Sequence, residues 1–474
     1  MKVLLINPGM DLNKFGGFKR FMQPMPPIGL AYLAGVLKEN QIEFKVIDDF
    51  AENSGIKGIC EAVKNYSPTV VGISCLTPSA DYVLSIAQSI KSINKQIKVL
   101  AGNLHASIFA EEFLKTGYVD IVFHGESEYS FLSVVKSISN NGDLSQIKAI
   151  SFRDNDKINH NFENKFLTDL DALPYPDWES FPIDKYGFLP FMDINKPALS
   201  VLASRGCPFS CSYCSLVYNN VPFRSRDHER VVDEIEFLIN RYNVKQIGFV
   251  DPIFPCNKEY GVKFCQSMIK RKLNKKIVWI SETRIDCVDM ELLELMRESG
   301  CRRLLFGIET ANLDVMGQIN KNIPLEKIRK NISLVRKAGI QSTGLFMIGF
   351  PSETKKDIMN TIDFANKLEL DFAKFAITTP FPGSRLFVDF FKNNKLRKDW
   401  ENYITYNPDP SKLVSVNEKL TAQELIDLQR IAHRKFYFRI KMIFWHLFVI
   451  RTVKLKDMFF GIGSLFFHGK FNKK

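Results

Sequence analysis

The sequence predicts an α/β protein with two parallel-sheet domains in series and a helical C-terminal tail. Short β-branched apolar runs alternate with single amphipathic stretches from residue 1 to about 135, and the alternation resumes from 198 to about 391. Because one helix separates consecutive strands, those strands are expected to be parallel. The chain has 474 residues, 45% of them hydrophobic, which is enough for two or three domains.

The first domain, residues 1–135, begins directly with an apolar strand. We expect strands at 2–7, 44–49, 70–75, 98–101 and 121–123, and helices at 30–40, 58–64, 82–93 and 108–115. Ligands of such sheets bind beyond the carboxyl ends of the strands, where this sequence carries polar and glycine-rich residues. No G-x-G-x-x-G follows the first strand, which argues against a dinucleotide site.

The second domain, residues 198–400, has six strand candidates and is predicted to form an open, partial (βα)6 barrel of the TIM type. The strands are expected at 198–203, 246–250, 277–281, 303–308, 343–348 and 375–379, with helices at 231–242, 260–271, 290–299, 325–337 and 356–367. Charged residues follow these strands at the end where such barrels carry their chemistry: Asp251, Glu282, Arg284, Asp286 and Glu309. Residues 136–197 are predicted to be a linker that contains one short strand at 150–153, and the prolines and aromatic residues at 173–182 fix an extended path.

Three cysteines lie within eight residues directly after the first barrel strand: Cys207, Cys211 and Cys214. Three thiolates on one short loop can bind three corners of a cubane iron–sulfur cluster and leave the fourth iron without a protein ligand. Two alternatives to a cluster are less suited to this sequence. Disulfides are typical of small secreted chains, and structural zinc usually takes four ligands in paired spacings, whereas the fourth ligand here would have to be the distant His228. The remaining six of the nine cysteines look like single thiols, and free thiols beside an oxygen-labile cluster indicate a reducing cytoplasm.

The Cys-x3-Cys-x2-Cys spacing, with Arg205-Gly206 before it and Tyr213 before the last cysteine, resembles the radical S-adenosylmethionine (SAM) superfamily. The resemblance implies that the three cysteines hold a [4Fe–4S] cluster and that the amino and carboxylate groups of SAM occupy the fourth iron. It also implies the activity: one electron cleaves SAM to methionine and a 5′-deoxyadenosyl radical, which abstracts hydrogen from a substrate.

The same resemblance implies which residues contact SAM. Glu282, Arg284 and Glu309 are the expected contacts, because carboxylates suit hydroxyl and ammonium groups and arginine suits a carboxylate. A structural ion pair is the alternative role for each. Phe209 and Tyr213 are expected to pack around the cluster and the adenine, with ordinary hydrophobic packing as the alternative.

Three stretches of the first domain are similar to the Rossmann-like cobalamin-binding domain that precedes the radical SAM domain in one large class. They are Pro26-Pro27-Ile28-Gly29, Gly102-Asn103-Leu104-His105 and Gly125-Glu126-Ser127-Glu128. The resemblance implies a bound cobalamin. The residues then expected near it are Ser74, Thr77, Gly102, His105, Gly125 and Glu126.

The sequence departs from that class at several positions. The D-x-H-x-x-G signature is absent, so cobalt is expected to have no histidine ligand from the protein. Asn103 and Ser127 replace glycines of the two turns, which leaves open that the domain keeps its fold without its cofactor. His105 can instead be a hydrogen-bonded turn histidine. In the barrel, Pro252 replaces the second acid common after Asp251.

Together these features predict a cobalamin-dependent radical SAM enzyme that methylates an unactivated C–H position of a small molecule through methylcobalamin. Within the class, the alternative function is an oxidative cyclase or rearrangement enzyme. Outside the class, the alternative is a non-catalytic iron–sulfur redox sensor. A sensor would not need acids and an arginine at successive strand ends. A methylthiotransferase would need a second cysteine triplet, but only Cys60 and Cys75 precede the first, and no G-x-S-x-G or H-E-x-x-H motif occurs. An electron donor such as flavodoxin or ferredoxin is expected, and no catalytic side chain is assigned.

The tail, residues 401–474, carries much of the net charge of +12. Thr421 and Glu424 form a capping-box pattern that predicts a helix over 421–434. The aromatic stretch that follows is interrupted by basic residues and has no apolar span of about 20 residues, so a transmembrane helix is not expected. Such a pattern suits a helix at the inner membrane face, with a hydrophobic or lipid-like substrate, or a helix packed on the barrel. Nucleic-acid binding is not expected, because no recognisable module is present.

Overall fold

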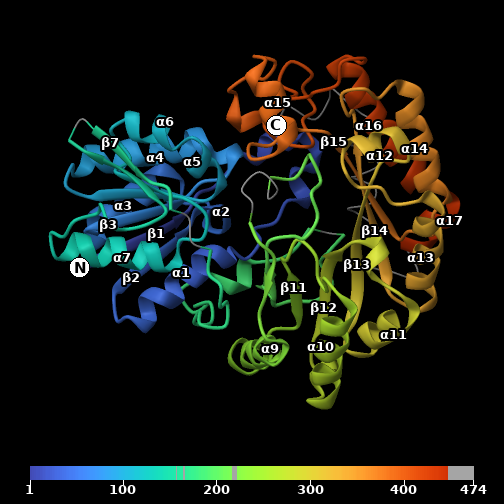
Figure 1. Cartoon of the computed structure of the whole chain (residues 1–474), viewed down its shortest axis with the longest axis horizontal. Helices are drawn as coiled ribbons and strands as arrows, with labels where there is room; N and C mark the ends of the chain where they lie inside the picture. The colour runs from blue at the N-terminus through green and yellow to red at the C-terminus, as the bar shows by residue number, and fades with distance from the viewer. Residues whose placement is uncertain (156, 164–165, 190, 216–220, 447–474) are drawn as a thin grey trace.

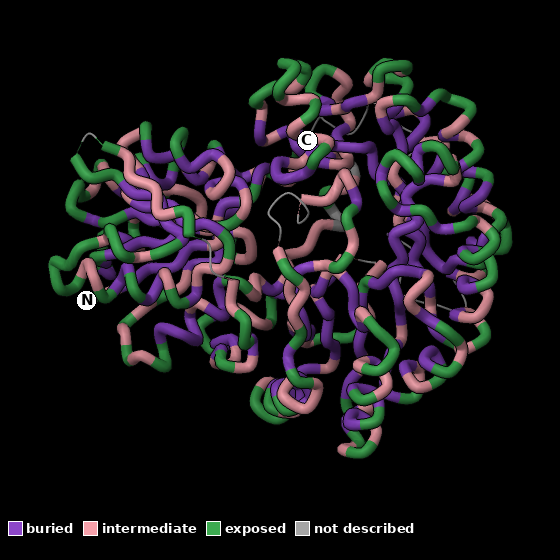
Figure 2. The backbone as a smooth tube through the Cα atoms, viewed as in Figure 1, coloured by how far each residue is buried: buried purple, intermediate pink, exposed green. Residues whose placement is uncertain are grey.

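A computed structural model of the chain describes residues 1–474 except 156, 164–165, 190, 216–220 and 447–474. Figure 1 shows two α/β bodies side by side, with the N-terminal sheet in blue and the barrel in green to orange. In both bodies the central strands are buried and the helices form the outer layer, whereas the edge strands β2 and β7 are partly exposed (Figure 2). The predicted order of a parallel-sheet domain, a partial barrel and a helical C-terminal region is confirmed.

The N-terminal sheet has seven strands in the order β2-β1-β3-β4-β5-β6-β7. The first five are parallel and confirm the five predicted strands: β1 (Lys2–Asn7), β2 (Glu43–Asp48), β3 (Val70–Ser74), β4 (Lys98–Gly102) and β5 (Ile121–Phe123). The helices are α1 (Ile28–Glu39), α2 (Asp49–Glu52), α3 (Gly55–Tyr66), α4 (Ala80–Ile93), α5 (Leu104–Ile108), α6 (Ala110–Lys115) and α7 (Glu128–Ser139). A short 3-10 helix, η1 (Leu12–Phe21), follows β1.

Two further strands of this sheet fall in the segment that the sequence predicted to be linker. β6 (Ile150–Asp154) pairs antiparallel with β5, and β7 (Lys157–Asn161) pairs antiparallel with β6. They join the sheet because Ile150 and Phe152 are buried in its core. The linker proper therefore begins after β7.

The barrel sheet has six parallel strands in the order β15-β14-β13-β12-β11-β8, as predicted. They are β8 (Ala198–Val201), β11 (Gln246–Phe249), β12 (Val278–Thr283), β13 (Cys301–Glu309), β14 (Gln341–Ile348) and β15 (Phe372–Ile377). The helices between them are α9 (His228–Tyr242), α10 (Lys258–Lys270), α11 (Met290–Glu298), α12 (Leu313–Gln318), α13 (Leu325–Lys337) and α14 (Lys355–Lys367). β12 ends later and β15 begins earlier than predicted, which brings Glu282 and Lys374 into strands.

The helices cover the outer face of the barrel sheet, where Trp279, Phe306 and Phe346 join the main hydrophobic core (Figure 1). Alternate residues point to the inner face. At the amino ends of the strands this inner face is filled by Phe188 of the linker, which packs on Ala198 and Ile280. Gly248 lies so close to Phe188 that a Cβ atom would stand 2.3 Å from the ring. The linker thus closes one end of the barrel.

The C-terminal region consists of α15 (Arg385–Lys392), η6 (Trp400–Asn402), α16 (Ala422–Tyr437) and α17 (Ile440–Phe444). The predicted capping box at the start of α16 is confirmed: Thr421 Oγ1 accepts from the Glu424 amide, and the Glu424 carboxylate accepts from the Thr421 amide. α16 covers the outer edge of β15, where the Gln429 side chain donates to the Phe375 carbonyl at 2.8 Å.

The start of the aromatic and basic stretch packs on the barrel, since Trp445 Nε1 donates to Asp371 Oδ1 at 2.6 Å. Its remainder, from 447 onward, lies outside the described residues. In the part of the chain that the structure describes, no helix has the length and apolar character needed to cross a membrane.

Candidate active site

The three cysteines lie on a loop whose base is fixed from both sides, here called the cysteine loop (residues 206–215). Its entry, β9 (Ser204–Arg205), pairs antiparallel with β10 (Arg224–Ser225). Gly206 has φ +80°, and a Cβ atom there would stand 2.2 Å from the Pro222 carbonyl oxygen, so only glycine fits. Buried Asp251 accepts from Ser204 Oγ at 2.6 Å, and burial raises the pKa of this carboxyl to about 7.

The cysteine loop brings its three thiols into one region. Cys211 is buried, Cys207 and Cys214 are partly exposed, and none is in a disulfide. The Cys214 amide donates to the Cys211 carbonyl at 3.0 Å, which turns the loop tightly. The Ser212 amide donates to the Ile319 carbonyl at 3.2 Å and anchors the loop on α12.

The donor set fits an iron–sulfur cluster. Burial raises the pKa of the Cys207 thiol, and the guanidinium of Arg284 and the ammonium of Lys321 oppose that rise. Cations beside a cysteine favour the thiolate, which is the form that binds metal. Among the described residues no three His, Cys, Asp or Glu side chains stand together in positions that could hold a single metal ion.

Glu309, the last residue of β13, is the centre of a polar group beside this loop. Its Oε1 accepts from Tyr213 Oη at 2.8 Å and from Lys321 Nζ at 2.6 Å. Gly307 leaves the necessary room, because a Cβ atom there would stand 2.5 Å from Glu309 Oε1 and 2.6 Å from Lys321 Nζ. Glu309 has φ +66°, which is uncommon for a residue with a side chain and recurs at functional sites.

This arrangement brings the predicted residues Tyr213 and Glu309 together and adds Lys321, which the sequence did not single out. Lys321 follows α12 in a polar turn, and no local pattern distinguishes it from the surface lysines of this chain. Tyr213 is thus tied to the polar group through its hydroxyl, while its ring packs near Phe350.

Arg284 is held against the cysteine loop. Its guanidinium donates to both carboxylate oxygens of Asp286, from Nε at 3.0 Å and from Nη2 at 2.9 Å. The same guanidinium lies 3.8 Å from the centroid of the Phe209 ring. A bidentate carboxylate and a stacked ring together fix the orientation of an arginine. The predicted residues Phe209 and Arg284 therefore form one unit.

Glu282 lies on the inner face of β12 and is exposed to solvent there. The walls of the barrel around it partly desolvate its carboxylate and raise the pKa to about 7, and the neighbouring Glu309 adds to the rise, while Lys321 and Lys374 oppose it. No described side chain donates a hydrogen bond to it. Glu282 is therefore a carboxyl without a fixed hydrogen-bond donor among the described side chains, and its pKa lies near neutral pH.

The predicted cobalamin-contacting residues lie at the carboxyl ends of β3, β4 and β5. Asn103 adopts φ +77° in place of the usual glycine, and its side chain donates to Ser74 Oγ at 3.2 Å. Gly102 ends β4 and is partly exposed, and Gly125 is exposed with φ +70°. The turn with Asn103 is thus closed by its own side chain.

His105 lies inside the domain. It is 1% exposed, its Nδ1 lies 3.3 Å from the Thr77 hydroxyl, and its ring centroid lies 4.7 Å from that of Phe109 and 4.8 Å from that of Trp400. Burial lowers the pKa of His105 to about 4. As placed, this imidazole and the Thr77 hydroxyl bonded to it offer no exposed edge to a corrin ring. The contact with Trp400 comes from the C-terminal region, which the sequence did not connect to this turn.

Glu126 is engaged by the barrel domain. Arg224 donates to it in bidentate fashion, from Nη2 to Oε1 at 2.6 Å and from Nη1 to Oε2 at 2.8 Å. The neighbouring Glu128 accepts from Arg205 at 2.6 Å. We call these four residues the interdomain ion-pair cluster. Both acids of the turn after β5 are therefore bound to the base of the cysteine loop.

A second junction joins three parts of the chain at Gly383, which follows β15 and has φ +84°. A Cβ atom there would stand 3.2 Å from Ile108 Cδ1 of α5 and 3.2 Å from the Ser215 carbonyl oxygen of the cysteine loop. The loop after β15, the turn after β4 and the cysteine loop therefore meet. The carboxyl ends of both sheets converge on one region.

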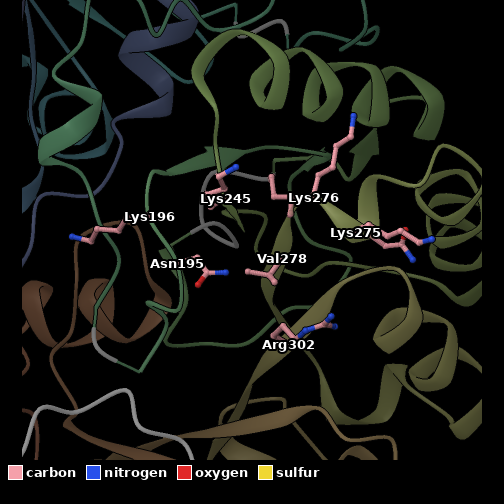
Figure 3. Close-up of a pocket in the computed structure, with 9 residues that line it drawn as sticks. Asn195, Lys196, Lys245, Lys275, Lys276, Val278 and Arg302 are labelled. Carbon is pink, nitrogen blue, oxygen red and sulfur yellow. The ribbon is translucent and has the colours of Figure 1, made fainter.

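Two hollows are lined by other residues, one of them far from this region and one at the carboxyl ends of β1 and β2. One, of about 390 Å³, lies at the amino ends of the barrel strands, and its basic side chains, such as Lys196, Lys276 and Arg302, point in different directions (Figure 3). The other, of about 550 Å³, lies beside the ends of β1 and β2, where Asp49 accepts from the Gly9 amide at 2.9 Å. Neither contains a predicted site residue.

Comparison with known proteins assigns both domains. Residues 201–365 match the family described as the radical SAM superfamily, and residues 19–135 match the B12 binding domain. Over 455 residues the chain is 31% identical to the uncharacterized methyltransferase PH0819 of Pyrococcus horikoshii, covering 94% of this chain and 95% of that protein. Over 450 residues it is 28% identical to the anaerobic magnesium-protoporphyrin IX monomethyl ester cyclase of Cereibacter sphaeroides, covering 93% of this chain and 71% of that protein.

Solved structures share the fold. The radical SAM methyltransferase TsrM from Kitasatospora setae aligns with a TM-score of 0.67 at 17% identity, covering 83% of this chain and 76% of that one. The cobalamin-dependent SAM radical enzyme OxsB aligns with a TM-score of 0.64 at 17% identity, covering 91% and 61%. The predicted family, enzyme class and cofactors are confirmed. The chain belongs to the radical SAM superfamily, and within it to the enzymes that use a [4Fe–4S] cluster and SAM together with a B12-binding domain.

Proposed function

We propose that the protein is a cobalamin-dependent C-methyltransferase that acts on an unactivated C–H position of a small molecule. The interdomain ion-pair cluster carries the proposal, because it fastens the B12-binding domain to the base of the cysteine loop. A methyl donor held by one domain and a radical generated in the other must meet at one substrate. The full-length similarity to a protein named as a methyltransferase supports the same activity.

In this proposal Cys207, Cys211 and Cys214 hold the cluster and leave one iron for SAM. The bound cofactors supply reductive cleavage of SAM, a hydrogen-abstracting radical and a methyl group. The protein binds and orients. Arg284, already fixed by Asp286 and Phe209, presents a guanidinium suited to the SAM carboxylate.

The two glutamates have different parts in the proposed SAM site. Glu309 is held by Tyr213 and Lys321 before any ligand arrives, so its carboxylate is preorganised toward ribose hydroxyl groups. Glu282 accepts no hydrogen bond from a described side chain, and its raised pKa means that the approach of positively charged SAM favours loss of its proton.

A second outcome, oxidative cyclisation, is favoured by one observation: the 28% identity to a porphyrin ester cyclase. Both outcomes need the same hydrogen abstraction, and they differ in whether a methyl group reaches the product. A further relative, the cytidylyl-2-hydroxyethylphosphonate methyltransferase of Streptomyces wedmorensis, is 25% identical over 493 residues, covering 92% of this chain and 90% of that protein. We place methylation first, because a relative that matches 94% of this chain over 95% of its own length is named for that reaction.

The proposed partners are a flavodoxin or ferredoxin as electron donor and an inner membrane surface, with a hydrophobic or lipid-like substrate. The membrane contact is supported by α17, on which Ile440 is 88% and Phe444 is 58% exposed beside basic residues. Cosedimentation of the full chain with phosphatidylglycerol vesicles tests it. Replacement of both apolar residues by serine is expected to abolish binding, and unchanged binding would remove this part of the proposal.

Anaerobic reconstitution with iron, sulfide and hydroxocobalamin, followed by SAM and dithionite, tests the activity. The wild type is expected to retain cobalamin and to form 5′-deoxyadenosine. Methyl label from SAM should appear in the retained cobalamin, which a cyclase does not require. Absence of 5′-deoxyadenosine would overturn the enzyme assignment, whereas 5′-deoxyadenosine without retained cobalamin would overturn only the role of the N-terminal domain.

A further inference from the structure

Lys374 is a cation on the inner face of the barrel that the proposed SAM site does not use. It lies in the middle of β15. The next residue, Phe375, packs outward on Phe436 of α16, with 6.4 Å between ring centroids, so Lys374 points to the opposite, inner face. Its Nζ lies 5.8 Å from the ring centroid of Tyr406 and 5.9 Å from that of Phe191.

Lys374 makes no hydrogen bond or salt bridge with any side chain in the part of the chain that the structure describes. The surrounding protein lowers the pKa of this ammonium, and Glu282 and Glu309 oppose the fall. Glu309 is already bonded to Lys321 at 2.6 Å and to Tyr213 at 2.8 Å. Lys374 is partly buried, and a partly buried ammonium without a fixed counter-ion is stabilised when an anion joins it.

The register of the strands places Lys374 level with the proposed SAM site and two strands away from it. Lys374 is aligned with Leu345 of β14, and Leu345 with Gly307 of β13. Gly307 is the position that makes room for the Glu309–Lys321 pair. Arg284 and Lys321 are the cations that act on Cys207, whereas Lys374 interacts electrostatically with the two glutamates. Lys374 lies on β15, the edge strand opposite β8, so its ammonium stands beside the proposed SAM site, where a second bound molecule would lie.

We propose that Lys374 binds an anionic group of the substrate, a carboxylate or a phosphate-like group attached to an apolar or aromatic body. The inference rests on the proposed function and names the substrate class of the same site. Phe191 and Tyr406 flank the ammonium and provide the apolar walls that such a body needs. An ammonium serves both acid types, because it acts as a point charge rather than as a planar fork.

Calorimetric titration of the full-length, reconstituted holoenzyme in the presence of SAM tests the proposal. The probes are benzoate and phenyl phosphate, with benzyl alcohol as the uncharged control. Wild type is expected to bind at least one anion, and Lys374→Gln is expected to weaken that binding about tenfold or more, the effect of losing a charge-assisted bond. Lys374→Arg should retain most of the affinity. The matched control is Lys245→Gln in the 390 Å³ hollow, which should bind like wild type.

Three results would overturn the assignment: equal binding by Lys374→Gln and wild type, weaker binding by Lys245→Gln alone, or no anion binding by wild type. A measurement on the wild-type protein keeps the proposal testable even if the variants misfold. Acetic anhydride labelling with mass spectrometry should modify Lys374 more slowly when phenyl phosphate is present, and equal rates would contradict the proposal. The proposed function is tested separately with the wild-type enzyme, and it fails if no 5′-deoxyadenosine forms. If SAM is cleaved but Lys374→Gln binds the anions as wild type does, only the role of Lys374 is overturned.

Discussion

Arg205 Nη2 of the barrel domain donates a 2.6 Å hydrogen bond to Glu128 Oε1 of the N-terminal domain. The pair is largely enclosed, with side chains 13% and 7% exposed. Arg205 stands two residues before Cys207, so the bond connects the first residue of α7 to the entry of the cysteine loop. Displacement of one domain would therefore move the other domain's cysteines.

Arg205→Met is expected to lower the free energy of unfolding by about 3–5 kcal/mol, because it leaves a buried carboxylate without its cation. Glu128 Oε2 already has no hydrogen-bond partner among the described residues, so no second bond compensates. Urea denaturation measures the loss. The control is Arg241→Met, which breaks a 3.0 Å pair with Glu179 whose side chains are each 54% exposed and should cost less than about 1 kcal/mol. Equal losses in the two variants would show that the Arg205 pair has no special role.

Cys211→Ala is expected to abolish cluster binding, because two thiolates on one loop cannot hold a cubane cluster. Iron and sulfide analysis with visible absorbance after anaerobic reconstitution provides the measurement. Cys60→Ala is the control, since that partly exposed thiol lies on α3, outside the cysteine loop. A full cluster in Cys211→Ala would refute the ligand assignment.

SAM is expected to bind more tightly at pH 8 than at pH 6. The pKa of Glu282 is raised to about 7 from 4.5, so the carboxyl is mostly neutral at pH 6 and mostly charged at pH 8, and only the charged form attracts the positively charged SAM molecule. Glu282→Gln should flatten this dependence. Equilibrium dialysis with labelled SAM at the two pH values checks it, and the same slope in wild type and Glu282→Gln would exclude Glu282 as the source.

His105→Phe is expected to keep cobalamin bound to the folded protein, because the imidazole is buried between Phe109 and Trp400. Loss of its hydrogen bond to Thr77 should cost about 0.5–1.5 kcal/mol near neutral pH. Cobalamin absorbance after gel filtration reports retention. Loss of cobalamin from a variant with an unchanged fold would restore His105 as a cofactor contact.

The same variant tests a pH effect. The pKa of His105 falls from 6.5 to about 4 on folding, so below pH 6.5 the unfolded chain takes up a proton that the folded protein refuses. Wild type therefore loses this part of its stability as the pH falls from 6.5 towards 4, and the stability gap to His105→Phe should narrow. A gap that widens on acidification would contradict the assignment of a neutral, buried imidazole.

The strands of both domains could be predicted because each is a short β-branched run with turn residues on either side, which is local information. β6 and β7 were not recognised as part of the first sheet, because two strands after a helix carry no mark of which sheet edge they join. The strand ends were less certain for the same reason: Glu282 was expected after its strand and lies within it.

Site residues could be predicted where the residue type itself determines the chemistry. They could not be predicted where a role depends on contacts between residues far apart in the sequence. The cysteine spacing indicated the cluster, and an acid and an arginine at strand ends indicated SAM. Lys321 and Trp400 were missed, since their partners Glu309 and His105 are joined to them only by the fold. Glu126 was expected near a cofactor, but its partner Arg224 lies 98 residues further along the chain, beyond any sequence pattern.

The linker has a consequence for the shape of the reaction space. Because Phe188 packs on β8, β11 and β12 from the inner face, a molecule bound between these strands cannot extend past its ring. The linker is thus a floor as well as a tether, and its side chains set the depth of the chamber above it. Replacing Phe188 by a smaller residue would deepen the chamber without changing the spacing of the two domains, so substrate length is a property that this segment, rather than either cofactor domain, can tune.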